Sequence, residues 1–385
     1  MNNTMAERVA GFGITIFGEM TRLAREHGAI NLSQGFPDFP GPEEVKEAAV
    51  EAIRGDLNQY AISYGALSLR RAIAAKVARY NGLADVDSEG EITVTCGATE
   101  AIFASLMGLV NPGDEVILFE PFFDSYVPGV VMAGGQPRYV TLHPPHFSFD
   151  PEELKSTFGP RTKVIMLNTP HNPTGKVYSR DELTLIAELC QEWDVVAITD
   201  EVYEHIIFDG AEHVSLASLP GMRERTITAN STGKSFSMTG WKVGWAIAAP
   251  PLTEAIRRAH QFITFCGAAP LQEAMAVALG TDDDYYQELA RFYTVRRDFL
   301  LEALRQAGFE VFVPQGTYYI LTDISSFGFP NDEEFCMHLV KEVGVAAIPA
   351  SFVYHHQELG QQLVRFAFCK KMESLETAVE RLSKL

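Results

Sequence analysis

Short apolar runs that alternate with helical stretches over residues 91–201 constrain the fold of this chain more than any other feature. Runs of this length that are rich in β-branched residues predict strands, and the stretches between them predict helices. Strands that alternate with helices form a largely parallel sheet through right-handed crossovers. We expect strands at 92–96, 115–119, 136–141, 163–167, 195–201 and 226–228, and helices at 100–110 and 180–193.

Ligands of such sheets bind outside the carboxyl ends of the strands, where Gly97, Asn172, Asp200 and Lys234 fall. The turn at 97–99 precedes a predicted helix whose N-terminal N–H groups and dipole can hold a phosphate. Asp200 ends a very apolar strand, where its charge is costly without a cationic partner. Four convergent positions indicate a binding site at this edge of the sheet.

Lys234 lies among small residues in Gly233-Lys234-Ser235, and three interpretations of this segment compete. A nucleotide-binding P-loop is excluded, because Thr228 stands where that loop needs its first glycine. An exposed loop lysine is the ordinary alternative. A Schiff-base lysine, made nucleophilic by burial or by a cationic neighbour, is the third. The segment alone leaves the last two open.

The C-terminal part of the chain predicts a small α+β domain, because strands and helices alternate there. Arg365 interrupts an apolar strand and must meet a carboxylate, supplied by the protein or by a substrate. Tyr60 is a core residue or a hydroxyl donor to an anion. The loop at 31–40 is a packed arm or a ligand contact. The expected strands are 310–313, 318–323 and 363–368, and the expected helices are 283–306, 332–341 and 373–382.

Charge and cysteine content exclude several classes of protein. The formal net charge of -19 disfavours nucleic acid and anionic membranes, which need clustered Lys and Arg. No apolar run is long enough to span a bilayer and the first residues show no targeting pattern, so we expect a cytoplasmic protein. Five scattered cysteines without a C-x-x-C pair, and histidines without helical i, i+4 spacing, indicate neither a disulfide framework nor a metal site.

Taken together, the motifs of the chain resemble the fold-type-I, pyridoxal-phosphate-dependent aminotransferases of class I, from Gly35 to the last helix. The resemblance implies an α/β fold with a mostly parallel seven-stranded sheet sandwiched by helices, plus a small α+β domain. It divides the chain into an N-terminal arm and part of the small domain (1–42), a large cofactor-binding domain (43–282) and a small C-terminal domain (283–385). The motifs are Gly97-Ala98-Thr99, Asn168-x-Pro170-x-Asn172-Pro173-Thr174-Gly175, Asp200-Glu201-x-Tyr203, Ser231-x-x-Lys234 with Thr239-Gly240-Trp241-Lys242-Val243-Gly244, and Arg365-Phe366.

The resemblance also implies roles for single residues. Lys234 would bind the cofactor aldehyde covalently and then carry the proton between substrate and cofactor. Asp200 would pair with the pyridinium nitrogen, and Asn172 and Tyr203 would hydrogen-bond the ring hydroxyl. Phe123 would stack on the ring. The implied catalytic set is Lys234, Asp200 and Tyr203.

Phosphate and substrate contacts follow from the same resemblance. The substrate α-carboxylate would bind Arg365 as a bidentate pair. A phosphate contact from the neighbouring subunit implies a homodimer with shared sites. The residues assigned to the phosphate are Gly97, Ala98, Thr99, Ser231, Lys242 and the neighbour's copy of Tyr60, and those assigned to the substrate are Arg365, Asn172, Gly35 and Phe17.

Lys242 stands where many relatives have arginine, so we expect a phosphate contact with fewer donors. Together with the segments 31–40 and 120–126, this lysine resembles the subgroup of kynurenine, glutamine–phenylpyruvate and methionine aminotransferases. The substrates of that subgroup are large and neutral. Phe17, Phe36 and Phe265 would line such a pocket or pack as core. Cys266 stands where some relatives have histidine, which leaves the side-chain preference open.

We therefore expect a ping-pong aminotransferase that moves an amino group from an aromatic amino acid, methionine or glutamine to a 2-oxo acid. Pyridoxal phosphate is the expected cofactor, with no metal, nucleic acid or membrane partner. Alternatives on the same fold are β-elimination from cysteine S-conjugates, an aspartate-type aminotransferase and a non-catalytic regulator. The lack of a basic DNA-binding extension disfavours a transcriptional regulator.

Overall fold

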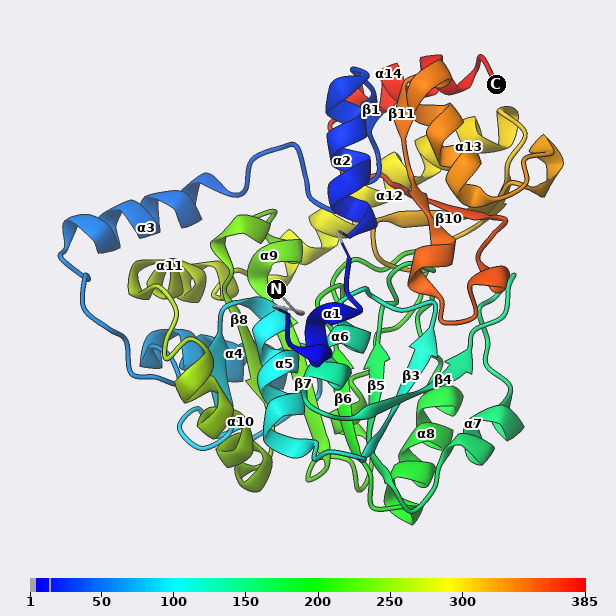
Figure 1. The fold of residues 1–385 in the computed structure, drawn as a ribbon. Helices are drawn as coiled ribbons and strands as arrows, with labels where there is room; N and C mark the ends of the chain where they lie inside the picture. Colours follow the sequence, from blue (N-terminus) through cyan, green and yellow to red (C-terminus); the bar gives the residue numbers. More distant parts are fainter. Residues whose placement is uncertain (1–4, 14) are drawn as a thin grey trace.

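A seven-stranded sheet forms the centre of the molecule in the computed structural model, which describes residues 5–13 and 15–385 (Figure 1). Residues 1–4 and 14, part of the predicted N-terminal arm, lie outside the described residues. The strand order is β2-β8-β7-β6-β5-β3-β4. β8 runs antiparallel to β2 and β7, whereas the other neighbouring pairs are parallel, so the predicted fold class is confirmed. The strands are β2 (Ile92–Thr95), β3 (Glu115–Glu120), β4 (Gln136–Thr141), β5 (Thr162–Asn168), β6 (Val196–Asp200), β7 (Thr226–Ser231) and β8 (Gly244–Ile247).

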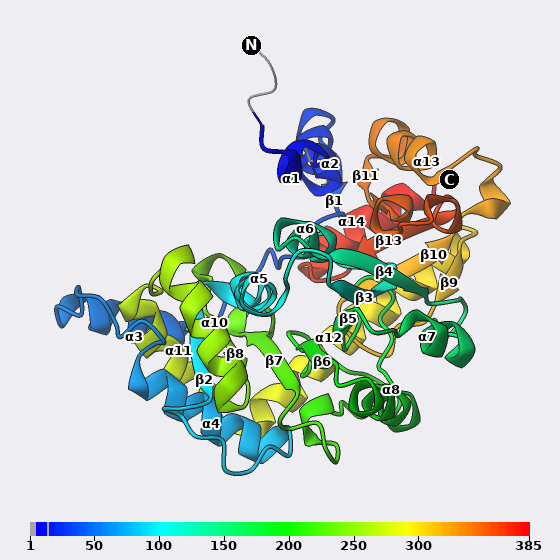
Figure 2. The ribbon, with the colours of Figure 1, turned by 60° about the horizontal axis from the view of Figure 1, so that its bottom comes forward.

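Alternate side chains of the central strands enter two different cores. In β3, Val116 and Leu118 pack with helices α5, α6 and α10, whereas Ile117 and Phe119 pack with α7 and α8. Figure 2 shows α5 and α6 on one side of the sheet and α4 and α8 on the other. Both faces are thus covered, as a parallel sheet requires. The helices of this part are α3 (Glu43–Arg54), which packs on α11, and α4 (Leu67–Tyr80), α5 (Gly97–Leu109), α6 (Tyr126–Met132), α7 (Pro151–Thr157), α8 (Arg180–Glu192), α10 (Pro250–Ile263) and α11 (Ala269–Leu279).

A second sheet, with the order β12-β13-β10-β9, is antiparallel and lies above the large sheet in Figure 1. Helix α2 packs on this part and the short strands β1 and β11 pair beside it. Across the described ranges, no helix combines the length and apolar character that a bilayer crossing demands. The helices and strands of the chain outside the large sheet and its flanking helices are α1 (Glu7–Ala10), which contacts α6, and α2 (Ile16–Glu26), β1 (Ile30–Asn31), α12 (Asp283–Gln306), β9 (Glu310–Phe312), β10 (Tyr319–Asp323), α13 (Asp332–His338), β11 (Val345–Ala346), β12 (Ile348–Pro349), β13 (Leu363–Ala367) and α14 (Met372–Leu382).

Three predictions of local structure are wrong. The predicted turn at 97–99 is the first turn of α5, because Gly97 takes a φ of 79° and the chain enters the helix directly. Lys234 lies in a short helix, α9 (Thr232–Ser235), and not in a loop. The predicted helix 332–341 leaves α geometry after α13 and continues as a π-helical turn, Leu339–Val343.

Candidate active site

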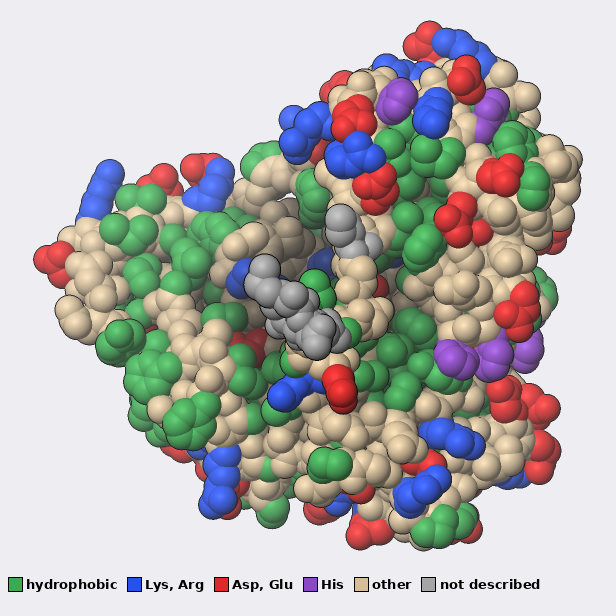
Figure 3. All heavy atoms as spheres, viewed as in Figure 1, with side chains coloured by type: hydrophobic (Ala, Val, Ile, Leu, Met, Phe, Trp, Pro, Cys, Tyr) green, Lys and Arg blue, Asp and Glu red, His purple; other side chains and the backbone are tan. Residues whose placement is uncertain are grey.

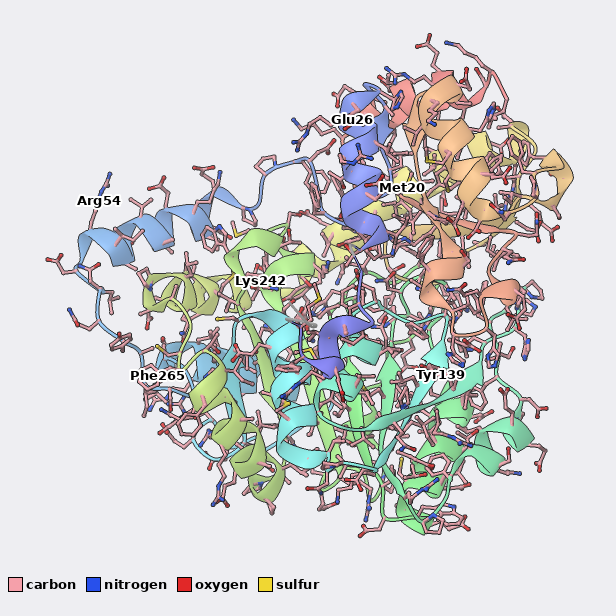
Figure 4. The ribbon with its side chains drawn as sticks, in the orientation of Figure 1. Met20, Glu26, Arg54, Tyr139, Lys242 and Phe265 are labelled. Atoms are coloured by element: carbon pink, nitrogen blue, oxygen red, sulfur yellow. The ribbon has the colours of Figure 1, made fainter. Side chains whose placement is uncertain are left out.

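A cavity of about 220 Å³ lies at the carboxyl ends of the large sheet and brings many of the predicted site residues together. In Figure 3 the surface is hollowed between the parts that carry α3 and α2, and Figure 4 places Lys242 there, near α9. The lining also contains residues that sequence reasoning missed, among them Tyr126 and Tyr319. The predicted residues in the lining are Gly97, Ala98, Thr99, Phe123, Asn172, Asp200, Tyr203, Ser231, Lys234 and Lys242.

The start of α5 forms an anion cradle with Lys242. A Cβ on Gly97 would lie 3.1 Å from the Lys242 Nζ, so the ammonium group rests directly against the first turn of the helix. A Cβ on Gly244 would lie 2.4 Å from the Gly97 carbonyl carbon, which only glycine avoids. The free N–H groups of the first helical turn and the lysine charge therefore face the same point.

The amine of Lys234 lies at the centre of the cavity. Its Nζ donates a hydrogen bond of 3.4 Å to the Gly35 carbonyl and lies 5.5 Å from the centre of the Tyr203 ring. Burial lowers the pKa of Lys234 to about 8, although the nearby Cys369 and Asp200 oppose this shift. A lysine with this pKa has a substantial neutral fraction near neutral pH and is a competent nucleophile.

Asp200 ends β6 beneath the cavity. Its carboxylate accepts hydrogen bonds from the Tyr126 hydroxyl (2.7 Å) and the Val202 N–H (3.3 Å), and neither donor is a cation. Burial raises the pKa of Asp200 to about 6 against the opposing effects of these donors and of Lys234. The site thus holds a carboxylate that a cationic ligand atom would stabilise.

Arg365 lies on β13 of the second sheet, and its side chain is held by the loop after β5 and by the segment after β1. The guanidinium donates to the Asn172 Oδ1 at 2.8 Å and to the Ser33 carbonyl at 3.0 Å. The rings of Tyr319 and Phe17 lie 4.1 and 5.1 Å from the guanidinium carbon. The residue is buried, and its Nε has no partner among the described residues. Free donors in a fixed plane suit a carboxylate ligand.

Several predicted site residues lie outside the cavity lining, namely Tyr60, Phe265, Arg365, Gly35, Phe17 and Phe36. Tyr60 is 82 % exposed, and its ring packs edge-on against Phe265 at 5.3 Å. Figure 4 shows Phe265 far from Lys242, on the side of α10 and α11. The interpretation of Phe36 and Phe265 as core residues is wrong, because both side chains are partly exposed to solvent.

A buried charge network lies behind Asp200. The carboxylate of Glu204 forms an ion pair with Lys76 and accepts from the amides of Asn81 and Asn230, each at 2.6 Å. Burial favours a raised pKa for Glu204, but Lys76 and nearby histidines outweigh it and lower the pKa to about 2. A lysine on an otherwise apolar helix face was the available signal for this network in the sequence.

Glu201 extends this network through His213, whose Nε2 lies 3.0 Å from the Glu201 carboxylate. The ligand atoms of Glu201, Glu204 and His213 all lie within 4.8 Å of one another, which is a spacing compatible with a metal ion. The oxygens of Glu201 already accept from Thr199 and Ser215 hydroxyls at 2.9 Å. Lys76 already supplies a cation to Glu204, whereas the Nδ1 of His213 has no partner among the described residues.

Comparison with known proteins agrees with this geometry. Residues 27–382, nearly the whole chain, match the family described as aminotransferase class I and II. The chain belongs to this aminotransferase family. Fold type I, dependence on pyridoxal phosphate and the predicted enzyme class are thereby confirmed.

Three relatives of this aminotransferase are similar to it over nearly its whole length. The probable N-succinyldiaminopimelate aminotransferase DapC of Mycobacterium tuberculosis is 45 % identical over 388 residues, covering 98 % of both chains. A structure of that activity from the same organism has a TM-score of 0.96 at 46 % identity and covers 99 % of both chains. The methionine aminotransferase of Escherichia coli is 42 % identical over 373 residues, covering 97 % of this chain and 96 % of the relative. A solved structure from Escherichia coli, described as that of a protein with a methionine aminotransferase function, has a TM-score of 0.96 at 41 % identity and covers 100 % of both chains. Human kynurenine–oxoglutarate transaminase 1 is 39 % identical over 414 residues, covering 98 % and 97 % of the two chains, so the predicted subgroup is also confirmed.

The cavity of this aminotransferase fits pyridoxal phosphate on its own chemistry. The cradle of Lys242 and the α5 N-terminus suits the phosphate. Lys234 offers an amine of lowered pKa to the aldehyde. Asp200, a buried carboxylate without a cationic hydrogen-bond donor, suits the protonated ring nitrogen.

Proposed function

We propose that this enzyme transfers an amino group between an L-amino acid with a large uncharged side chain and a 2-oxo acid, by a ping-pong mechanism. Aromatic amino acids, methionine and glutamine are the proposed donors. One observation carries this choice: Lys234 and Lys242 are the cations of the cavity lining, Arg365 adjoins it through its hydrogen bond to Asn172, and all three are needed for the cofactor and the α-carboxylate. Among the described lining residues, no further cation remains for a second substrate carboxylate.

The proposed catalytic set is Lys234, Asp200 and Tyr203. Lys234 anchors the cofactor through its amine and then moves a proton to and from the substrate Cα. Asp200 keeps the ring nitrogen protonated, and Asn172 and Tyr203 hydrogen-bond the ring hydroxyl. When bound, pyridoxal phosphate supplies an electron-accepting ring that stabilises negative charge at that carbon. Phe123, which lines the cavity, would hold the ring by packing against it.

Arg365 orients the substrate by binding its α-carboxylate. The Asn172 and Ser33 contacts fix the plane of the guanidinium before the ligand arrives, so little side-chain entropy is lost on binding. The Gly35 backbone and the Phe17 ring border the same position. We also propose that residues 43–282 carry the cofactor and that residues 283–385, with the arm at 1–42, carry this carboxylate site.

A homodimer is part of the proposal. Exposed apolar side chains gather near the loop before α4 and the end of α10, including Tyr60 (82 % exposed), Ile62 (49 %) and Phe262 (91 %). Figure 3 shows apolar surface on this side of the molecule, below α3. Ser231, Lys242 and the residues 97–99 would share the phosphate with Tyr60 of the second copy.

Mixed dimers test the shared site. A dimer of one Lys234→Ala chain and one Tyr60→Phe chain has one intact site only when Tyr60 acts across the interface. Phosphate affinity of that site should then equal the wild-type value. A weakened affinity would mean that Tyr60 serves its own chain.

A second candidate substrate follows from the relative of 45 % identity, whose name specifies N-succinyldiaminopimelate. Its additional carboxylates would need a cation that the described lining does not provide. Initial rates with one 2-oxo acid should be measured for methionine, glutamine, phenylalanine, aspartate and N-succinyldiaminopimelate. The proposal requires a kcat/KM at least tenfold higher for one of the first three, and a preference for either of the last two would overturn it.

β-Elimination is measured in the same preparation. Release of pyruvate and ammonia from a cysteine S-conjugate should be slower than transfer of the amino group from methionine. The opposite order would replace the proposed reaction by a lyase reaction. Lys234→Ala distinguishes these two enzymatic reactions from a non-catalytic regulator. The turnover of an enzyme should disappear in this variant, whereas ligand binding by a regulator could persist.

A further inference from the structure

Three tyrosine phenols meet beside Lys234, and only Tyr203 among them belongs to the proposed catalytic set. The Tyr319 hydroxyl lies 3.2 Å from the Tyr203 hydroxyl, and the Tyr318 hydroxyl donates to the Gly35 carbonyl at 2.7 Å. All three side chains are buried. Burial raises the pKa of each phenol, so each keeps its proton near neutral pH.

The hydroxyl of Tyr319 is not required for packing. Its ring lies over the Arg365 guanidinium at 4.1 Å, and a phenylalanine ring would make the same contact. The hydroxyl also demands space, because a Cβ on Gly35 would lie only 1.8 Å from it. A buried hydroxyl needs a hydrogen-bond partner, and Tyr203 supplies it.

We propose that Tyr319 is a positioning residue that donates its hydroxyl proton to the Tyr203 oxygen and so strengthens Tyr203 as a hydrogen-bond donor. The inference rests on the proposed contact between Tyr203 and the ring hydroxyl of the cofactor. When Tyr203 gives its proton to that oxygen, the hydrogen bond at 3.2 Å has one possible direction, from Tyr319 to Tyr203.

Donation to the Tyr203 oxygen polarises its O–H bond, because hydrogen bonds in a chain reinforce one another in a poorly solvated site. A donor at the ring oxygen favours the form of the bound cofactor that has lost its titratable proton. Loss of the Tyr319 hydroxyl should therefore move the pH midpoint of the cofactor absorbance upward, on the order of half a pH unit.

Four variants test this chain of contacts by absorbance titration of the holoenzyme between pH 5 and 10. Tyr319→Phe should raise the midpoint, and Tyr203→Phe should raise it further. The double variant Tyr319→Phe, Tyr203→Phe should match Tyr203→Phe alone, because Tyr319 acts through Tyr203. Tyr178→Phe is the control, since it removes a buried hydroxyl that has no partner among the described residues.

The outcomes distinguish the proposed role of Tyr203 from the inferred role of Tyr319. An unchanged midpoint in Tyr203→Phe would refute the proposed role of Tyr203. A shift in Tyr203→Phe without one in Tyr319→Phe would refute the inference alone, and so would additive shifts in the double variant. The melting temperature and the KM for the amino donor should stay at wild-type values in Tyr319→Phe, because the ring over Arg365 remains. A raised KM with an unchanged midpoint would instead assign Tyr319 to packing.

Discussion

Lys234 must lose its proton before its amine can attack an aldehyde, so cofactor capture by the apoenzyme should follow the titration of this side chain. Burial lowers the pKa of Lys234 from 10.5 to about 8. At pH 7.5, roughly a quarter of such amines are neutral, compared with about one in a thousand for an ordinary lysine. The buried site therefore increases the reactive fraction roughly two-hundredfold.

Stopped-flow absorbance after mixing apoenzyme with pyridoxal phosphate measures this rate directly. Between pH 6.5 and 8 the second-order rate should rise roughly sixteenfold, in proportion to the neutral fraction, and above pH 8 it should level off. Lys234→Ala should bind the cofactor without the covalent absorbance change, which separates capture from simple binding. A rate that continues to rise through pH 10, as for free lysine, would show that burial does not activate Lys234.

Further substitutions test the charges of the site and of the buried network that contains Lys76 and Glu204. Asp200→Asn should raise the free energy of unfolding of the apoenzyme at pH 7.5 by up to about 3 kcal/mol, while activity falls at least about a hundredfold. The sign follows from the raised pKa of about 6: the carboxyl group stabilises the fold below pH 3.8, and this contribution is lost as the pH rises through 6. Urea unfolding of the wild-type and variant apoenzymes at pH 7.5 and below pH 3.8 measures this contribution. A variant that is less stable than the wild type at pH 7.5 would contradict the raised pKa of Asp200. Lys76→Met should cost about 3–5 kcal/mol in the same assay, because it leaves Glu204 buried without a cation. Adding Glu204→Gln should recover most of that loss, and equal stability of the single and double variants would refute it. Arg365→Lys should raise the KM for amino donors ten- to hundredfold, since the planar pair with the carboxylate is lost, and an unchanged KM would exclude the α-carboxylate contact.

Most strands of the large sheet could be predicted, because each is indicated by residues that are close together in the sequence. Apolar runs bounded by turn residues located the strands β2 to β7, and β4, α8 and α12 begin and end within a residue or two of the predicted positions. The rule that ligands bind at the carboxyl ends of parallel strands then placed Asp200 and Asn172 at the cavity. Both conclusions need only periodicity and topology.

Contacts between distant segments were not predictable in this way. Lys76 lies on α4 and its partner Glu204 follows β6, and no pattern in either segment indicates the other. Tyr319 lies in an apolar strand, and this pattern predicts a core residue and gives no indication of its contact with Tyr203. The conformation of Lys234 in α9 depends on tertiary contacts of its neighbours, since four residues cannot form a stable helix alone.

The site joins the two sheets through Arg365, and this explains how an acidic chain can bind anionic ligands. The net charge of -19 gives no general attraction for phosphate or carboxylate groups, so affinity must come from fixed local donors. Lys242 and the α5 N-terminus are contributed by the large sheet, whereas Arg365 projects from β13 and is tied to Asn172 across the gap. Because Asn172 and Ser33 already hold the guanidinium, a carboxylate meets donors that need no reorganisation, and the entropy of ordering them has been spent during folding.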